Sequence, residues 1–519
     1  MTRTEPNGPV VLSIDAGTTG IRAFAVDQSG APVCASYREF TQHFPSPGLV
    51  EHDAEEIWRT TVVVLDELCR TIDRPVAALG ITNQRETVVA WSRRTGAPLA
   101  PAIVWQDRRT ASRCDELTAD GRLPLIRNTT GLVLDPYFSA TKIEWLLSNG
   151  VPNDSDLMLG TIDTWLIWKL SGGAAHVTDT SNASRTMLFD INSLEWSSEL
   201  LDLFSVPRTS LPRVVPSVGQ VALTVAGCGV PEGVPISGIV GDQQGALFGQ
   251  ACLAPGMVKN TYGTGSFVLM NTGESLAPST EGLLRTVAWT VPTTMLNSNT
   301  DQRATTGPSP IGDGPHTTHY ALEGAIFVTG AAVQWLRDGL SIIDSAGEVG
   351  PLAQSVEDSG GVILVPAFTG LGSPYWDPSA RGSIFGITRG TTRAHLARAV
   401  VEAMAYQTRD VVDAMRNASG ASLRQLRVDG GAAVMDLLLQ IQADQLNCEV
   451  LRSSVAETTA LGAAYMAGLG AGVWTTAAEI ESNWANDATF GPNTDRSAAD
   501  AGYALWKRGV TRSLNWAED

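Results

Sequence analysis

The sequence has few cysteines, and none of them falls in a paired motif. Six are scattered over 519 residues without a Cys-x-x-Cys pair. Neither a zinc site nor a disulfide framework is therefore indicated, and isolated buried thiols in a reducing compartment are expected. A long apolar run is also missing: the N-terminus has no apolar signal core, and the uncharged run 460–474 is short and mostly Ala and Gly. We therefore predict a packed helix there, no membrane span, and a cytoplasmic protein.

Basic residues are scarce as well. The 36 Lys and Arg residues stand against 54 Asp and Glu residues, for a formal net charge of −18. Such a chain is a poor match for the phosphate backbone, so no nucleic-acid partner is expected. A nucleotide could still bind where local donors or a divalent metal supply positive charge. The hydrophobic content of 43% is globular, and the length suffices for two large domains or three to four small ones.

Two hairpin patterns recur half a chain apart. Residues 12–27, LSIDAGTTGIRAFAVD, alternate apolar residues on both sides of a Gly-Thr-Thr-Gly turn. Residues 256–276 repeat the pattern, with Gly-Thr-Gly at 263–265. Two similar hairpins of this kind indicate two domains built on one plan.

Two later segments predict a helix and a glycine turn. An apolar stripe at helical spacing runs through 391–415, with Thr391 or Thr392 as a possible cap and Gly420 as a terminator. Residues 427–446 predict a strand, a Gly-Gly turn and a helix. Such a turn leaves backbone N–H groups free for an anion or a nucleotide, although a plain strand–helix connection explains it equally well.

The segment 290–320 is polar and rich in Thr, Pro and Gly, and it separates two strand-like runs. A structureless loop of this length is uncommon in a compact domain. It is either a surface elaboration or a mobile flap, and the sequence favours neither.

Asp15 and Asp242 each lie by a glycine-bearing segment after a strand-like run. Phosphoryl transfer needs backbone and hydroxyl donors around the phosphates, carboxylates for Mg²⁺, and a carboxylate to deprotonate the acceptor hydroxyl. The sequence has neither a P-loop nor the signature set of protein kinases. These residues alone favour a two-domain nucleotide-dependent enzyme.

Eleven stretches, in order along nearly the whole chain, carry a family pattern; among them are GLVEHDAEEIW (48–58), GITNQRETVVAW (80–91), AIVWQDRRT (102–110), PISGIVGDQQGALFGQ (235–250) and KNTYGTGSF (259–267). Together they resemble the FGGY family of carbohydrate kinases, and within it the members that phosphorylate glycerol. The resemblance implies an α/β fold of two actin-like (ribonuclease H-like) ATPase domains around a central cleft. Residues 1–253 would bind the polyol and part of the phosphates, and residues 254–519 would bind the nucleotide.

The resemblance also implies a polyol site. Asp242 would be the general base for the attacking hydroxyl. Hydrogen bonds on one side of the polyol and aromatic surface on the other would come from Arg85, Glu86, Tyr137, Gln243, Trp105 and Phe267. This division suits a triol, which has one hydroxyl-bearing edge and one C–H edge.

For the nucleotide, the resemblance implies that Asp15 orients Mg²⁺ through water. The residues that would face ATP are Thr18, Thr19, Gly20, Arg22, Gly263, Thr264, Gly330, Gln334 and Gly431. The chain departs from the family where Gly20 and Ile21 replace two serines, which removes a phosphate-facing hydroxyl. It also has Met435 where the family often has Asn, so no polar nucleotide contact is expected from that side chain.

The implied activity is that of a transferase: ATP-dependent phosphorylation of glycerol to sn-glycerol 3-phosphate. Glycerol and ATP would be the partners, Mg²⁺ the metal, and a homo-oligomer, dimer or tetramer, the assembly. Two alternatives are a kinase for another polyol or sugar, such as erythritol or xylulose, and a catalytically silent nucleotide-binding actin-like protein. ADP release with a panel of polyols distinguishes them.

Overall fold

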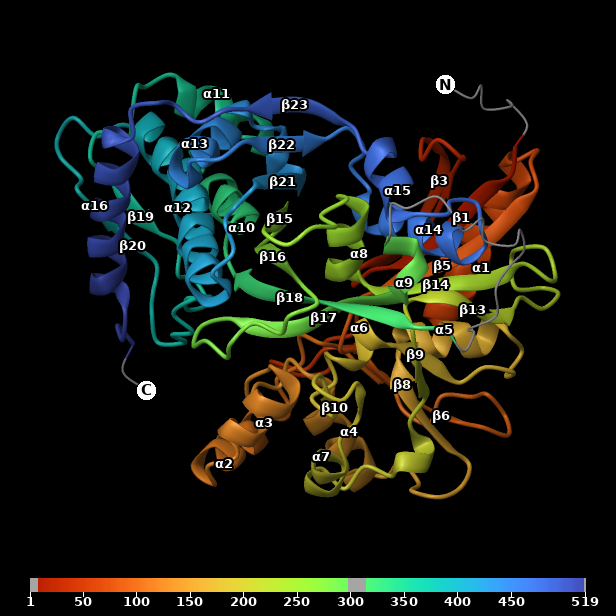
Figure 1. The fold of residues 1–519 in the computed structure, drawn as a ribbon. Helices are drawn as coiled ribbons and strands as arrows, with labels where there is room; N and C mark the ends of the chain where they lie inside the picture. Colours follow the sequence, from red (N-terminus) through yellow and green to blue (C-terminus); the bar gives the residue numbers. More distant parts are fainter. Residues whose placement is uncertain (1–7, 297–313, 518–519) are drawn as a thin grey trace.

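The computed structural model describes residues 8–296 and 314–517. A six-stranded mixed sheet forms the centre of the N-terminal half (Figure 1). Its strands, in spatial order, are β13 (Val218–Leu223), β14 (Pro235–Gly241), β5 (Val76–Asn83), β1 (Val10–Ala16), β2 (Gly20–Val26) and β3 (Pro32–Glu39). The first predicted hairpin is confirmed, because β1 and β2 pair antiparallel with Ala16 opposite Ile21.

A seven-stranded mixed sheet forms the centre of the C-terminal half. Its strands, in spatial order, are β17 (Leu284–Pro292), β18 (His316–Ile326), β16 (Ser266–Gly273), β15 (Met257–Tyr262), β21 (Gln425–Gly430), β22 (Val450–Ser453) and β23 (Asn486–Phe490). The second predicted hairpin is confirmed as β15 and β16.

The two sheets share one plan. In the first, β1, β2 and β3 form an antiparallel meander, and β5 and β14 are added parallel to β1. In the second, β15, β16 and β18 form the meander, and β21 and β22 are added parallel to β15. The repeated hairpin in the sequence is therefore the start of a repeated sheet topology.

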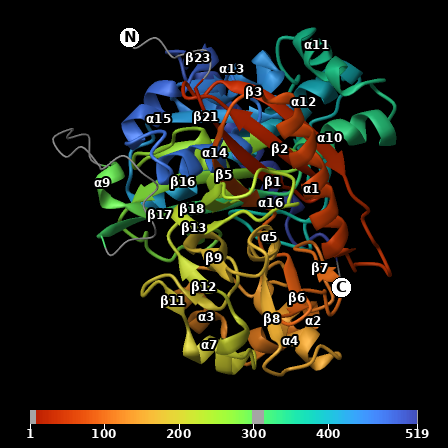
Figure 2. The same cartoon turned by 90° about the vertical axis from the view of Figure 1, so that its right-hand side faces the viewer.

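A third, four-stranded sheet lies at one end of the molecule, below both large sheets in Figures 1 and 2. Its order is β4 (Glu51–His52), β7 (Ala102–Ile103), β6 (Val88–Ser92) and β8 (Leu157–Thr161). Three two-stranded sheets pair β9 (Val177–Asp179) with β12 (Arg213–Val215), β10 (Phe189–Asp190) with β11 (Glu195–Trp196), and β19 (Ile363–Val365) with β20 (Ser383–Phe385).

The helices pack on these sheets. They are α1 (Ala54–Thr71), α2 (Ala111–Ala119), α3 (Leu123–Thr130), α4 (Ser139–Ser148), α5 (Ile162–Leu170), α6 (Thr180–Ala183), α7 (Ser198–Leu203), α8 (Asp242–Gly249), α9 (Thr293–Leu296), α10 (Gly330–Gln334), α11 (Val349–Gln354), α12 (Arg393–Ser419), α13 (Asp436–Leu446), α14 (Thr458–Gly470), α15 (Ala477–Asn483) and α16 (Ser497–Ser513). A π-helical turn, Trp335–Gly339, follows α10, and short 3₁₀ helices occupy Arg208–Ser210, Ala346–Glu348 and Gly431–Val434.

The helix α14 joins the two halves. It belongs to the C-terminal half by sequence, but it packs against β1, β5 and β14 of the first sheet and crosses α8. The hydroxyls of Ser13 and Ser237 donate to the carbonyls of Ala460 and Ala467, at 2.7 and 2.9 Å. In Figure 1, α8 lies between the two large sheets, so the helix that begins at Asp242 is held from both sides.

The predicted helix in 391–415 is confirmed as α12, which begins after Thr392 and ends before Gly420. Thr392 and His395 form a reciprocal capping pair, and Gly420 adopts a left-handed φ of 67° that suits glycine. The predicted packed helix in 460–474 is confirmed as α14, and no helix among the described residues is long and apolar enough to cross a membrane.

Two other expectations are adjusted. In the segment 290–320, both ends are regular structure, in β17, α9 and β18, and residues 297–313 lie outside the described residues. Four of the six cysteines are buried, as expected for isolated thiols, but Cys34 and Cys69 are partly exposed. They lie on the edge strand β3 and near the end of α1.

Candidate active site

The parallel strands β1, β5 and β14 bring three segments to one edge of the first sheet. Asp15 is near the end of β1, Arg85 and Glu86 follow β5, and Asp242 follows β14 as the first residue of α8. Because parallel strands end at the same edge, residues far apart in sequence meet there. Sequence analysis had named all four residues as site residues.

Charge coupling connects the two aspartates. Burial raises the pKa of Asp15 to about 7, with a further rise caused by Asp242 and an opposing effect of Arg22. Burial also raises the pKa of Asp242, but Arg85 and the backbone N–H of Gln243 oppose the rise. The Asp242 side chain is 28% exposed, so this carboxylate can still reach a ligand from its open side.

Arg85 is held entirely by protein groups. Its guanidinium is 2% exposed, and Nε lies 3.0 Å from Asp242 Oδ1. Nη1 donates to Glu323 at 2.6 Å and to Gln244 at 3.2 Å, and Nη2 lies 3.4 Å from the Tyr137 hydroxyl. In this structure Arg85 therefore orients the predicted base.

A second arginine completes a buried network of four charged side chains. Arg185 donates to Glu86 at 2.7 Å and to Glu323 at 2.9 Å. Burial raises the pKa of Glu323, but Arg185 and Arg85 outweigh that effect and lower it to about 2. Two arginines and two glutamates balance in charge, which makes their burial tolerable.

Glu86 has an unusual backbone. Its φ of 64° lies in the left-handed region, which is uncommon for a residue other than glycine. Such strain is found most often at functional sites, where surrounding contacts hold it in place. The bond from Arg185 and a bond from the Ser139 hydroxyl to the Glu86 carbonyl at 3.0 Å supply such contacts.

Of the aromatic residues predicted to line the polyol site, Trp105 and Tyr137 are in contact with each other. Trp105 and Tyr137 pack edge to face, with ring centroids 5.4 Å apart. The indole Nε1 of Trp105 donates to the Thr18 hydroxyl at 2.9 Å, so this pair contacts the turn of the first hairpin. Phe267 lies on β16 and is half-buried against the apolar cluster around α8 and α14.

The turn of the first hairpin is compact. Thr18 is half-buried, Thr19 is exposed, and the Gly17 N–H donates to the Gly20 carbonyl at 3.0 Å. A side chain at Gly20 would collide with the Arg38 carbonyl and the Tyr37 hydroxyl, so only glycine fits there. Arg22 forms an ion pair with Glu457, at the start of α14, and lies over the Tyr37 ring.

Three of the predicted nucleotide residues of the second half, Gly263, Thr264 and Gly330, lie together. Gly263 and Thr264 are exposed in the turn between β15 and β16, and the Gly263 carbonyl accepts from the Gly330 N–H at 3.0 Å. A side chain at Gly330 would meet that carbonyl at 2.5 Å. Gln334 is exposed at the end of α10, and Gly431 is exposed where the chain leaves β21.

Gly430 and Gly431 form the predicted turn, with one difference. Gly430 has a φ of 87°, and a 3₁₀ helix, Gly431–Val434, precedes α13. The helix therefore begins at Asp436, five residues beyond Gly431. A side chain at Gly431 would meet no neighbouring atom, so this turn is open to a ligand.

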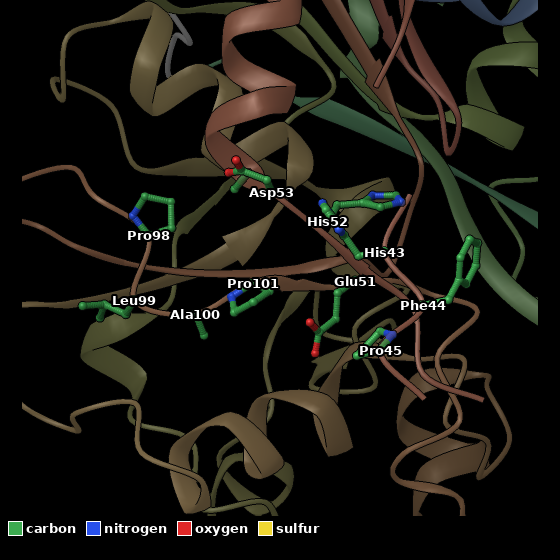
Figure 3. A pocket seen from close by; sticks show the side chains of 11 residues that line it. His43, Phe44, Pro45, Glu51, His52, Asp53, Pro98, Leu99, Ala100 and Pro101 are labelled. Carbon is green, nitrogen blue, oxygen red and sulfur yellow. The ribbon is translucent and has the colours of Figure 1, made fainter. Parts of the chain in front are cut away.

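A cavity lies away from these residues. It has a volume of about 690 Å³ and is lined by residues including His43, Glu51, His52 and Asp53, shown in Figure 3. None of the predicted site residues lines it. We place the candidate site at the ends of β1, β5 and β14, because the coupled carboxylates lie there and not in this cavity.

His52 links this cavity to the hairpin. It is fully buried, and its Nε2 lies 2.8 Å from the Gln42 side-chain oxygen. Gln42 in turn donates to the Thr18 carbonyl at 2.9 Å, and Gln84 donates to the Gly17 carbonyl at 3.1 Å. These two glutamines therefore hold the hairpin turn in place through its backbone carbonyls.

Sequence reasoning missed Arg185, Glu323, Gln244 and Lys259. None of these four residues is given a role by the sequence analysis. A usable signal was present: a charged residue in an apolar stretch, as in ALEGAIF for Glu323. Buried charges require partners, so such residues deserve a search for one another.

The six-stranded and seven-stranded sheets share one topology, and the helices α8 and α14 cross next to them. Together these elements define a two-domain α/β protein. The model of the FGGY family of carbohydrate kinases matches residues 10–249 with its N-terminal domain and residues 258–471 with its C-terminal domain. The chain belongs to this family.

Named relatives cover almost the whole chain. A glycerol kinase of Dechloromonas aromatica is 52% identical over 98% of both chains, and glycerol kinase 2 of Thermotoga maritima is 51% identical over 98% of this chain and 99% of its own. The crystal structure of Plasmodium falciparum glycerol kinase with ADP superposes with a TM-score of 0.89 at 34% identity, over 98% of this chain and 99% of its own. The predicted actin-like fold is confirmed by this similarity.

A xylulose kinase of Lactobacillus acidophilus superposes with a TM-score of 0.84, but at 20% identity over 97% of this chain and 98% of its own. A similarity of this kind shows the common fold alone.

Proposed function

We propose that the protein transfers the γ-phosphoryl group of ATP to a terminal hydroxyl of glycerol, which yields sn-glycerol 3-phosphate and ADP. The observation that carries this function is the identity of about half of all residues, over nearly the full length, with proteins named glycerol kinase. The site chemistry agrees with it, since a coupled carboxylate pair lies at the edge of the first sheet.

Asp242 is the general base. It accepts the proton of the terminal hydroxyl as the hydroxyl oxygen attacks the γ-phosphorus. Arg85 at 3.0 Å and the Gln243 N–H at 2.7 Å fix the carboxylate and favour its ionised form. A base positioned in this way contributes about 10²–10⁴-fold to the rate.

The polyol lies between polar and aromatic groups. Glu86 accepts from its hydroxyls, Arg85, Tyr137 and Gln243 add polar contacts, and Trp105 and Phe267 cover its carbon side. Trp105 is held for this task from two directions, by the ring of Tyr137 and by the Thr18 hydroxyl. A small pocket with buried polar groups rejects analogues that leave those groups unpaired.

Two hairpin turns bind the phosphates. Thr18, Thr19 and Gly20 contribute from the first half, and Gly263 and Thr264 from the second. Their N–H groups can approach phosphate oxygens closely because the turns carry little side-chain bulk. Gly330, Gln334 and Gly431 lie along the rest of the nucleotide.

Arg22 has a competing partner. It forms an ion pair with Glu457 in this structure, so it contacts the phosphates only after turning away from that carboxylate. The Glu457 side chain is 36% exposed, and water can take the place of the arginine there.

A divalent metal fits this site. Burial, and after it the neighbouring Asp242, raise the pKa of the Asp15 carboxyl, and a bound cation would offset the repulsion between the two carboxylates. Among the described residues, no group of three or more possible protein ligands is close enough to hold a metal without a substrate. Asp15 would hold Mg²⁺ when the substrates are bound, and the ion would supply positive charge that offsets the charge of the phosphates.

The two alternatives are less favoured. A xylulose kinase shares the fold at 20% identity, against about 50% for the glycerol kinases. A silent nucleotide-binding protein has no use for a carboxylate held by Arg85 beside a polar pocket. Assembly as a dimer or tetramer is part of the proposal from family resemblance alone.

The test is ADP release by the purified protein with ATP, Mg²⁺ and a panel of glycerol, erythritol, xylulose and gluconate. Glycerol is expected to give the highest kcat/KM. A higher kcat/KM with another compound of the panel would identify that compound as the substrate in place of glycerol. No stimulation of ADP release by any of them would favour the catalytically silent nucleotide-binding protein. Chiral analysis of the product checks the sn-3 position.

A further inference from the structure

Lys259 is a fully buried lysine on β15 for which the proposed reaction has no use so far. Its Nζ donates to the side-chain oxygen of Gln243 at 2.5 Å and to the Thr261 hydroxyl at 3.1 Å. Burial lowers its pKa to about 8, while Asp429 and Asp242 act in the opposite direction. Burying an ammonium in this position carries a desolvation cost that an apolar side chain on the same strand would not have.

The bond from Lys259 decides which way the Gln243 amide faces. A glutamine amide has one acceptor oxygen and two N–H donors on one planar group. Since the oxygen accepts from Lys259, it is directed toward β15, and the N–H donors are directed away from that strand. Without the ammonium, both orientations of the amide would be open to it.

Gln243 is adjacent to Asp242 at the start of α8, and its backbone N–H also donates to the Asp242 carboxylate at 2.7 Å. Asp242 accepts the proton of the attacking hydroxyl in the proposed reaction. The oxygen of that hydroxyl also has lone pairs, which can accept hydrogen bonds. Donors on Gln243 complement it, whereas a second acceptor would repel it.

We propose that Lys259 is a positioning residue for the polyol: it holds the Gln243 amide so that its N–H donors, and not its oxygen, face the substrate hydroxyls. This inference rests on the proposed function. It goes beyond it by giving the hydroxyl-binding site a donor side and by naming the residue that sets it.

Burial lowers the pKa of Lys259, but nearby carboxylates partly stabilise its ammonium. Asp242 on α8 and Asp429 on β21 attract it from the two halves of the molecule, Glu323 adds a weaker attraction, and Arg85 opposes them. Asp429 is itself fixed, because the Gln250 amide donates to it at 2.7 Å. The bond from Lys259 to Gln243 therefore joins β15 of the second half to α8 of the first half.

The experiment measures the KM for glycerol, the KM for ATP and kcat in Lys259→Met. The KM for glycerol is expected to rise about tenfold, the loss that corresponds to one hydrogen bond, while the KM for ATP stays close to wild type. Thr261→Val is the matched control, since it removes the other partner of Lys259 and leaves the bond to Gln243. It is expected to leave the KM for glycerol close to wild type.

The double variant Lys259→Met with Gln243→Ala separates positioning from general stability. If Lys259 acts through Gln243, the double variant has the same KM for glycerol as Gln243→Ala alone. Effects that multiply in full overturn the inference, and so does an unchanged KM in Lys259→Met. Equal rises in both KM values also overturn it.

Should Lys259→Met fail to fold, Gln243→Glu carries the test. A carboxylate still accepts from Lys259 but has no N–H donor, so the KM for glycerol rises about tenfold if donors are required. An unchanged KM overturns the inference. Wild-type protein that shows no ADP release with glycerol refutes the proposed function instead, which keeps the two failures apart.

Discussion

Asp242 combines two properties that a base in phosphoryl transfer needs: a fixed direction and an open side. Arg85 fixes it at 3.0 Å, and 28% of its side chain remains exposed. Asp242→Asn keeps the shape and the contact with Arg85 but cannot accept the proton. We expect kcat to fall at least about 10²-fold, because the loss is confined to the transition state.

Nucleotide affinity is the control for Asp242→Asn. Calorimetric titration with a non-hydrolysable ATP analogue is expected to give a dissociation constant close to wild type. A loss of nucleotide binding as large as the loss of kcat would contradict the role of a base. It would indicate that this carboxylate supports the nucleotide site.

The raised pKa of Asp15 predicts how the stability of the protein depends on pH. Its pKa of about 7 in the folded protein is above the usual value near 4 for an unfolded chain. Between these values the unfolded carboxyl is ionised while the folded one is still protonated, so stability falls as pH rises through this window. Asp15→Asn removes the effect, and its melting temperature relative to wild type is expected to rise between pH 4 and pH 7.

Thermal unfolding without nucleotide or metal, at several pH values, measures this difference. The exposed Asp115→Asn serves as the control for the removal of one carboxylate. A constant difference between Asp15→Asn and wild type across the window would show that Asp15 has an ordinary environment. The Asp15→Asn variant is also expected to lose activity, because the Asp15 carboxylate is absent.

At the scale of elements, the crossing of α8 and α14 depends on the absence of side chains. A Cβ on Gly462 of α14 would collide with the Gly245 carbonyl of α8, and a Cβ on Gly249 would collide with the Thr458 carbonyl. These contacts let the two backbones approach closely enough to hold the helix that begins with Asp242. The crossing is therefore part of what positions the base.

Gly462→Ala should force the two helices apart. We expect a loss of about 1–3 kcal/mol of stability, as for other overpacked cores, together with a lower kcat. Gly347→Ala is the control, because a side chain at that exposed glycine meets no neighbour. Chemical denaturation and steady-state kinetics on both variants measure the two effects. Full activity and stability in Gly462→Ala would show that the crossing has room to spare.

Much of the fold could be predicted from the sequence because its signals are local. The hairpins at β1–β2 and β15–β16, the cap at Thr392 and the terminator Gly420 each depend on a few neighbouring residues. The site was less accessible. Arg85 and Glu323 form a 2.6 Å bond although they are 238 positions apart, and only the sheet topology brings them together. The role of Lys259 likewise follows from a strand facing a helix of the other half.

At the scale of the whole molecule, the two halves are not independent in the way that the predicted boundary at 253 and 254 suggests. The apolar face of the first sheet is covered by α14, which comes from the second half of the chain. Val11, Ala78 and Val240 are fully buried there, and all three pack in one cluster with α14. A chain that ends at residue 253 would expose this face to water.

We therefore expect the fragment 1–253 to fold poorly alone. A large apolar face left in water loses the hydrophobic free energy that drives folding. The fragment should bind a hydrophobic dye and lack a cooperative thermal transition. Co-expression with 254–519 should restore both the transition and glycerol-dependent ADP release, because α14 then returns to the sheet. A fragment 1–253 that unfolds cooperatively by itself would show that the first sheet needs no cover from the other half, and that the boundary separates two autonomous domains.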